Sequence, residues 1–131
     1  MATLELPKVT ERIELDSTRG AISEIAAYLQ GHLGQRVTAY LAGLTDPKMV
    51  GQWAAGKVHP RDLPSLRLRH AYQAARLLVE EFGDETARAW FFGTNTQLDD
   101  EAPAYLLRRA QTPEDVRPVL RAARRFVEVT Y

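Results

Sequence analysis

The segment between residues 36 and 61 carries side chains of the types that read and hold DNA. A glutamine such as Gln52 can form two hydrogen bonds to adenine, and a lysine such as Lys48 can reach guanine or a phosphate. Basic groups at the flanks suit phosphate contacts, which fix the register on the duplex. The segment holds four basic side chains and one acidic one, although such counts also occur in an ordinary solvated surface. The predicted DNA contacts are Arg36, Lys48, Met49, Gln52, Lys57 and Arg61.

A stripe of arginines lies near the end of the sequence. Arg117, Arg121, Arg124 and Arg125 recur at helical spacing, with apolar residues between them. Such a stripe is most often a solvated helix face. Arginine nevertheless makes up 14 of the 17 basic residues, and its planar guanidinium forms bidentate bonds to carboxylates. We therefore predict that these arginines and Tyr131 form a protein-binding face; contact with a DNA backbone is the alternative.

Three consecutive aromatic residues end a predicted helix at 85–92. Neighbouring residues on a helix point about 100° apart, so the three side chains cannot all face one core. We place Trp90 in a small aromatic core. Phe91 and Phe92 are predicted as partner contacts, because exposed aromatic residues are favoured anchors in protein interfaces.

The other polar residues show no catalytic or metal-binding pattern. His32, His59 and His70 lack ligand spacing to carboxylates, so we predict no metal site. The acidic triplet 99–101 has no partner base and fits a solvated loop or a helix cap. A Gly-rich phosphate loop and a nucleophile elbow are both missing. We therefore predict a protein that is not an enzyme and that binds no cofactor.

The composition favours one small soluble protein. The chain has 131 residues, of which 45% are apolar and 26% charged, and this suits a packed core. The lack of cysteine excludes disulfides and favours a reducing compartment, and no segment resembles a signal peptide or a membrane span. We expect a cytoplasmic location. The 17 basic and 17 acidic residues cancel, which is unusual for a DNA-binding domain.

Apolar periodicity predicts an all-α fold. Helices are expected at 22–33 and 35–44, and Asp46-Pro47 is a strong start signal for a third helix that ends near Ala55. Two short helices joined by a glycine-containing turn form a helix-turn-helix, whose second helix can enter the major groove. An ordinary helical hairpin in a small bundle is the alternative.

The second half of the sequence predicts one long helix and three shorter segments. Residues 68–82 have the longest apolar period, and they follow a loop with two prolines. Helices at 85–92 and 103–109 come next, and Thr112-Pro113 opens the last one. Pro118 predicts either a kink there or a helix that truly starts at that residue.

We divide the chain into three parts. These are a tail at 1–16, a helix-turn-helix domain at 17–62 and a partner-binding domain at 63–131.

Two stretches resemble known families. Residues 49–60 resemble the end of the recognition helix in Xre-type regulators; the matching residues are Val50, Trp53, Gly56, Lys57 and Pro60. The order of this unit, a long helix and the pattern A-x-x-W-x-x-x-x-N-x-x-L-x-x-x-x-P-x-x-L-L resembles the Xre/MbcA/ParS toxin-binding family of antitoxins over about residues 20–130. The matching residues are Ala87, Trp90, Asn95, Leu98, Pro103, Leu106 and Leu107. The loop departs from the family pattern at Thr94, Thr96, Asp99 and Asp100.

The resemblance implies an antitoxin of a type II toxin–antitoxin pair. Its partner would be a RES-domain toxin that consumes NAD, and the C-terminal part, with Asn95 among the contacts, would cover the entrance of the toxin's active site. A homodimer would bind operator DNA through the helix-turn-helix and repress its own operon. Two alternatives remain: a stand-alone Xre-family regulator whose C-terminal part serves dimerisation, and an interaction module that has lost DNA binding.

Overall fold

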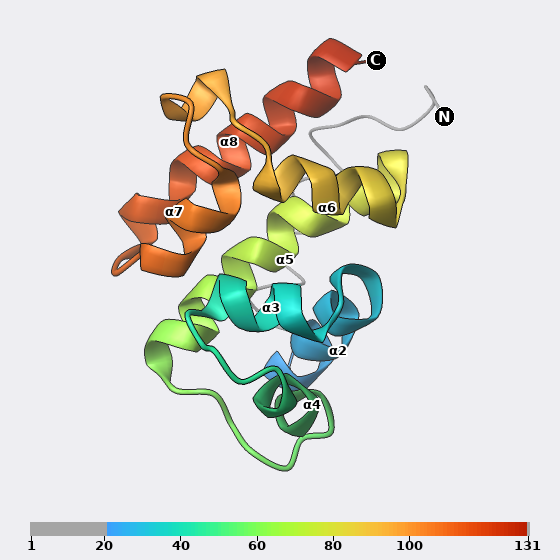
Figure 1. The fold of residues 1–131 in the computed structure, drawn as a ribbon, viewed down its shortest axis with the longest axis vertical. Helices are drawn as coiled ribbons and strands as arrows, with labels where there is room; N and C mark the ends of the chain where they lie inside the picture. Colours follow the sequence, from blue (N-terminus) through green and yellow to red (C-terminus); the bar gives the residue numbers. More distant parts are fainter. Residues whose placement is uncertain (1–20, 131) are drawn as a thin grey trace.

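Residues 21–130 are described by the computed structural model, and they form the all-α fold that the periodicity predicts (Figure 1). This part of the chain contains seven α-helices and no strand. The predicted tail at 1–16 and Tyr131 lie outside the described residues. The elements are α2 (Ile22–Leu33), α3 (Gln35–Ala42), α4 (Lys48–Ala54), α5 (Asp62–Phe82), α6 (Asp84–Phe92), η1 (Thr96–Leu98), α7 (Pro103–Arg109) and α8 (Pro113–Thr130).

Helices α2, α3 and α4 form one group, in which α4 packs chiefly against α2. The apolar positions of α2 that define its period are all buried, and Val50 and Trp53 hold α4 on the same core. Gly51 allows a close approach between elements. A Cβ at this residue would lie 3.1 Å from Nε2 of Gln35, whose side chain donates to Gln30 at 2.7 Å.

Helix α5 is the central element of the fold. It packs against α2 and α3 and also against α6, α7 and α8. The helix begins at Asp62, inside the segment that we predicted as a loop. The physical reason is the position of Pro64, which falls in the first helical turn, where a missing backbone N–H costs no intrahelical bond.

Helix α8 runs without interruption from Pro113 to Thr130, with Pro118 inside it. The helix does not start at Pro118. Pro118 lacks the N–H that would bond to the Glu114 carbonyl, so the helix loses one backbone hydrogen bond. The helix continues through it, and Val116 and Val119 on either side are buried in the core. Phe82 and Phe126 meet edge to face across the two helices, with ring centroids 5.3 Å apart.

One hydrophobic core joins both predicted domains. It contains Leu29 and Trp53 from the first part and Leu78, Phe91 and Val119 from the second. The predicted boundary at residue 62 falls at the start of α5, which contributes to the core along its length. Among the described helices, none combines the length and the apolar character that crossing a membrane requires.

Candidate functional site

The predicted DNA contacts lie around α4 and the loop that follows it, at the lower end of the molecule in Figure 1. Lys48 and Gln52 are exposed on α4, and Lys57 is exposed in the loop. Arg36 and Arg61 are also exposed, on α3 and just before α5. The side chains predicted to hydrogen-bond DNA are therefore accessible to a partner.

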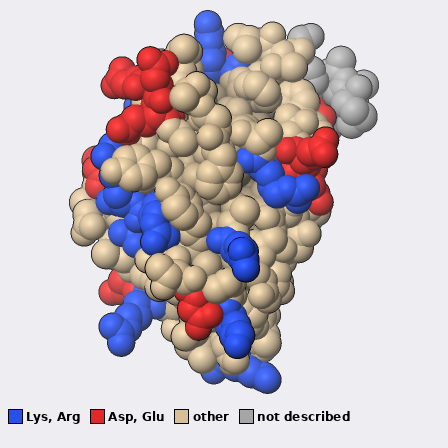
Figure 2. Space-filling view, viewed as in Figure 1, with Lys and Arg blue, Asp and Glu red and all other residues tan. Residues whose placement is uncertain are grey.

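Two observations limit this surface as a DNA-binding site. Met49 packs half-buried against the core, so its prediction as an exposed groove contact is wrong in part. Asp46 adds a negative charge beside Lys48, and its carboxylate accepts the Lys48 backbone N–H at 3.0 Å. Figure 2 shows basic side chains at this lower end with acidic atoms between them, rather than one continuous basic face.

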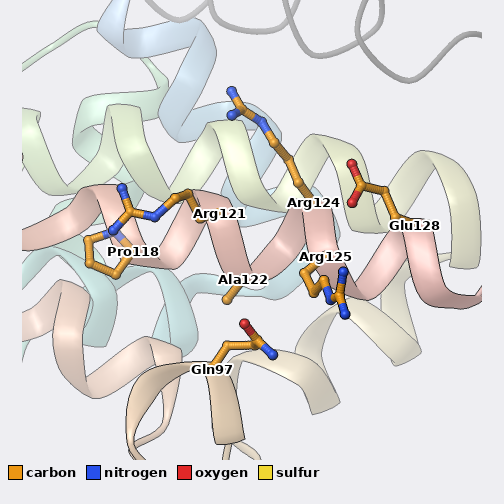
Figure 3. Close-up of a pocket in the computed structure, with 7 residues that line it drawn as sticks. All are labelled: Gln97, Pro118, Arg121, Ala122, Arg124, Arg125 and Glu128. Atoms are coloured by element: carbon orange, nitrogen blue, oxygen red, sulfur yellow. The ribbon is translucent and has the colours of Figure 1, made fainter.

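The predicted partner-binding arginines lie on α8, toward the opposite end of the molecule (Figure 1). Arg121, Arg124 and Arg125 line a pocket of about 320 Å³ together with Gln97 of η1. Pro118, Ala122 and Glu128 complete its lining. Figure 3 shows Gln97 across from Ala122 and Arg125, whereas Arg124 and Glu128 point away from Gln97.

The four arginines of the stripe are not equivalent. Arg121 and Arg125 are exposed, whereas Arg124 is half-buried. Arg117 does not line the pocket and instead pairs with Glu114 at 3.3 Å, one turn earlier on the helix. Arg121 and Arg125 are therefore the exposed arginines of the pocket, and Figure 3 shows Arg125 as the one beside Gln97 of η1.

The exposure of the three consecutive aromatic residues agrees only in part with the prediction. Trp90 is buried, as predicted. Phe91 is completely buried and packs edge to face on Trp90, so its prediction as a surface contact is wrong. Phe92 is 48% exposed and lies beside Tyr40, with ring centroids 5.7 Å apart. Phe92 is therefore the aromatic residue of the three that a partner can reach.

Asn95 has a structural role that the sequence did not reveal. Its side-chain oxygen accepts the backbone N–H of Gln97 at 2.9 Å and so caps η1. Its backbone oxygen accepts from Leu98 and Asp100, and Asp99 and Asp100 both have positive φ in the same loop. Asn95 thus shapes the loop that carries Gln97.

Most residues of the antitoxin-like pattern are core residues. Ala87, Trp90, Leu98, Pro103 and Leu107 are all buried. The pattern therefore describes how α6, the η1 loop and α7 pack together.

Two arginines that we did not single out join the predicted domains at the end of α3. Arg67 of α5 is buried and donates to backbone oxygens of Ala42 and Ala110. Arg108 of α7 donates to the backbone oxygens of Tyr40 and Leu44. Burial and the nearby charge of Arg108 lower the pKa of the Arg67 guanidinium. Their signal in the sequence is weak, because nothing local distinguishes them from surface arginines.

A second group of polar contacts connects the end of α2 with α6. His32 Nδ1 lies 2.7 Å from the Asp84 carboxylate, and Arg88 donates to the His32 backbone oxygen at 2.9 Å. The Tyr28 ring lies against that of His32, with centroids 4.2 Å apart and the planes tilted by 40°, and burial raises the pKa of the Tyr28 phenol to about 12. Between residues 21 and 130, no three His, Cys, Asp or Glu side chains are grouped to hold a metal ion.

Comparisons with known protein families, with curated proteins and with solved structures find no match to this chain. Function is therefore inferred from the surfaces described above and from the resemblance of the motifs.

Proposed function

We propose that this chain is the antitoxin of a type II toxin–antitoxin pair and that it neutralises a RES-domain toxin. The observation that carries the proposal is the pocket between α8 and η1. There three arginines of the stripe, which the sequence assigns to toxin binding, line a pocket with Gln97, two residues after the predicted contact Asn95. The antitoxin-like motif also packs as one helical unit, as a shared fold requires.

The arginine face supports a mechanism of steric occlusion. The guanidinium groups of Arg121 and Arg125 would form charge-assisted hydrogen bonds to carboxylates at the rim of the toxin's active site. Phe92 would add an apolar anchor, because exposed aromatic residues in interfaces supply much of the binding energy. A helix held across the entrance would keep NAD out, so the antitoxin itself needs no cofactor and performs no catalysis.

The second proposed activity is operator binding through α4. A cytoplasmic homodimer would place two copies of Lys48 and Gln52 on the two halves of a palindromic site. Few basic side chains surround α4, and Asp46 lies among them. The chain would therefore make few phosphate contacts, bind DNA with modest affinity and show a shallow dependence on salt.

Co-expression with the product of the neighbouring gene, which the proposal requires to be a RES-domain protein, tests the antitoxin proposal. The wild type should copurify with that protein and restore growth. The variant Arg121→Glu/Arg125→Glu reverses the charge of the pocket, so it should lose copurification and leave the cells arrested. Circular dichroism should show an unchanged helix content, because both side chains are exposed.

The matched control is the variant Lys48→Ala/Gln52→Ala, which changes two exposed residues at the other end of the molecule. It should neutralise the toxin as the wild type does while failing to shift operator DNA. Neutralisation by the charge-reversed α8 variant, or equal loss of both activities in the control, would contradict the proposed division between the two ends.

A further inference from the structure

The end of α3 is held by a side chain from α7. Nη1 of Arg108 donates to the backbone oxygens of Tyr40 at 2.8 Å and Leu44 at 3.1 Å. The guanidinium also lies over the Tyr40 ring, 4.5 Å from its centroid. The last carbonyls of a helix have no partner within the helix, and a positive charge is favourable beside them. Arg108 therefore adds a charged donor to the Tyr40 carbonyl, which also accepts the Gly43 N–H at 3.0 Å, and bonds to the Leu44 carbonyl in the turn that leads to α4.

A second arginine holds the same turn from inside the protein. Nη1 of Arg67 donates to the backbone oxygen of Ala42 at 3.1 Å. Its Nε and Nη2 donate to the backbone oxygen of Ala110, at 3.0 and 2.8 Å, where α7 ends. One guanidinium thus connects the end of α3 with the end of α7.

The turn held by the two arginines requires a glycine at residue 43. Its φ of +90° belongs to the left-handed region, and a Cβ here would lie 2.3 Å from Nη1 of Arg67. The turn therefore closes on the Arg67 guanidinium with no room for a side chain. Leu44, the next residue, accepts from Arg108 and precedes α4 by one short turn.

We propose that Arg108, with Arg67 behind it, is a positioning residue for the DNA-binding helix α4. Both arginines belong to the part of the chain assigned to the toxin, so that part holds the turn between α3 and α4, while α2 supplies most of the packing of α4. The expected effect on DNA affinity rests on the proposed DNA-binding function. The positioning of α4 itself can be measured without DNA.

The first test compares Arg108→Ala with Arg88→Ala. Arg88 makes a similar bond from α6 to the end of α2, so its loss is a matched control away from the turn. We expect hydrogen exchange at residues 43–50 to be about tenfold faster in Arg108→Ala only. Buried Trp53 on α4, made the sole tryptophan by Trp90→Phe, should show a red-shifted emission in the same variant.

The second test measures binding to a duplex of the chain's own promoter region. Arg108→Ala should bind about tenfold more weakly than the wild type, and Arg108→Lys, which keeps a charged donor, should recover part of the loss. Arg88→Ala should bind as the wild type does. An unchanged helix content by circular dichroism shows that the fold is retained in each variant.

The outcomes separate the two proposals. Unchanged exchange and emission in Arg108→Ala overturn the positioning role, whatever the DNA result. Equal effects of Arg108→Ala and Arg88→Ala also overturn it, because they show general destabilisation. If the wild type does not bind its promoter, the proposed operator binding fails, and exchange and emission still decide whether Arg108 positions α4.

Discussion

At the scale of single residues, Phe91 and Phe92 give a direct test of the core. Phe91 is fully buried, whereas Phe92 is half exposed beside Tyr40. Phe91→Ala should therefore lower the free energy of unfolding by about 3–5 kcal/mol, through lost burial and the cavity left behind. Phe92→Ala should cost about 1 kcal/mol or less. Urea denaturation of both variants measures the difference, and equal losses would contradict the burial described here.

Gly43 and Gly56 allow backbone strain to be separated from a steric clash. Both have positive φ, but only at Gly43 would a Cβ meet another group, the Arg67 guanidinium. Gly56→Ala should cost about 1 kcal/mol from the left-handed backbone alone. Gly43→Ala should cost about 2–4 kcal/mol, because it also displaces a buried, hydrogen-bonded arginine. Thermal or urea unfolding checks both values; equal costs would show that Arg67 moves aside freely.

At the scale of elements, the start of α8 depends on one carboxylate. Asp115 accepts the backbone N–H groups of Gln111 at 2.9 Å and Thr112 at 3.1 Å. These bonds, from Gln111 first and then Thr112, hold the pKa of Asp115 below its usual value. A depressed pKa in the folded state stabilises the protein above the unfolded pKa, and this contribution is lost as the pH falls through the folded pKa.

Asp115→Asn should therefore flatten the acid side of the stability profile. We expect the wild type to lose stability relative to this variant as the pH drops below about 4, the ordinary range of an aspartate. Above that range the wild type should be the more stable of the two. Unfolding temperatures measured from pH 7 to pH 2.5 check the sign, and parallel profiles would show that the cap makes no contribution.

Local sequence predicted the helices well where a period or a cap was present. The α2 period, the Asp46-Pro47 start of α4 and the Thr112-Pro113 start of α8 all agree with the structure. The start of α5 and the continuity of α8 were harder to predict. Each helix contains a proline, Pro64 or Pro118, and a proline in a sequence usually indicates a loop or a helix end.

The candidate site was less predictable than the helices. The helical period of α8 correctly placed Arg121 and Arg125 on the surface. Which of Phe91 and Phe92 is buried depends on the face that α6 turns toward the core, and the local sequence does not determine that face. Arg67 and Arg108 were missed because their partners are backbone oxygens distant in the sequence. Such contacts leave no pattern in the spacing of residues.

At the scale of the whole molecule, the two candidate surfaces lie at opposite ends of one continuous core (Figure 1). The neutral total charge therefore says little about either surface. Exposed basic residues lie around α4 at one end and on α8 at the other, with acidic residues between them in the sequence. One chain can accordingly present a DNA-binding and a protein-binding surface without overlap.

The proposed DNA-binding surface around α4 contains two residues with different proposed roles, and their substitution should have different effects on DNA binding. Lys57→Ala would remove a proposed phosphate contact, so it should weaken binding to all DNA sequences and lower the salt slope by about one. Gln52→Ala would remove a proposed base contact, so it should weaken operator binding by about 1–3 kcal/mol with little effect on random DNA. Titrations at several salt concentrations with both duplexes distinguish the two effects, and identical behaviour would contradict the assigned roles.

The central claim is that the α8 pocket blocks a toxin that consumes NAD. The most direct measurement is NAD consumption by a purified RES-domain protein from the same operon, the partner that the proposal requires. Wild-type chain should stop the reaction at a stoichiometric ratio, and Arg121→Glu/Arg125→Glu should leave it running at the uninhibited rate. Inhibition by that variant as strong as by the wild type, or no inhibition by the wild type, would contradict the claim.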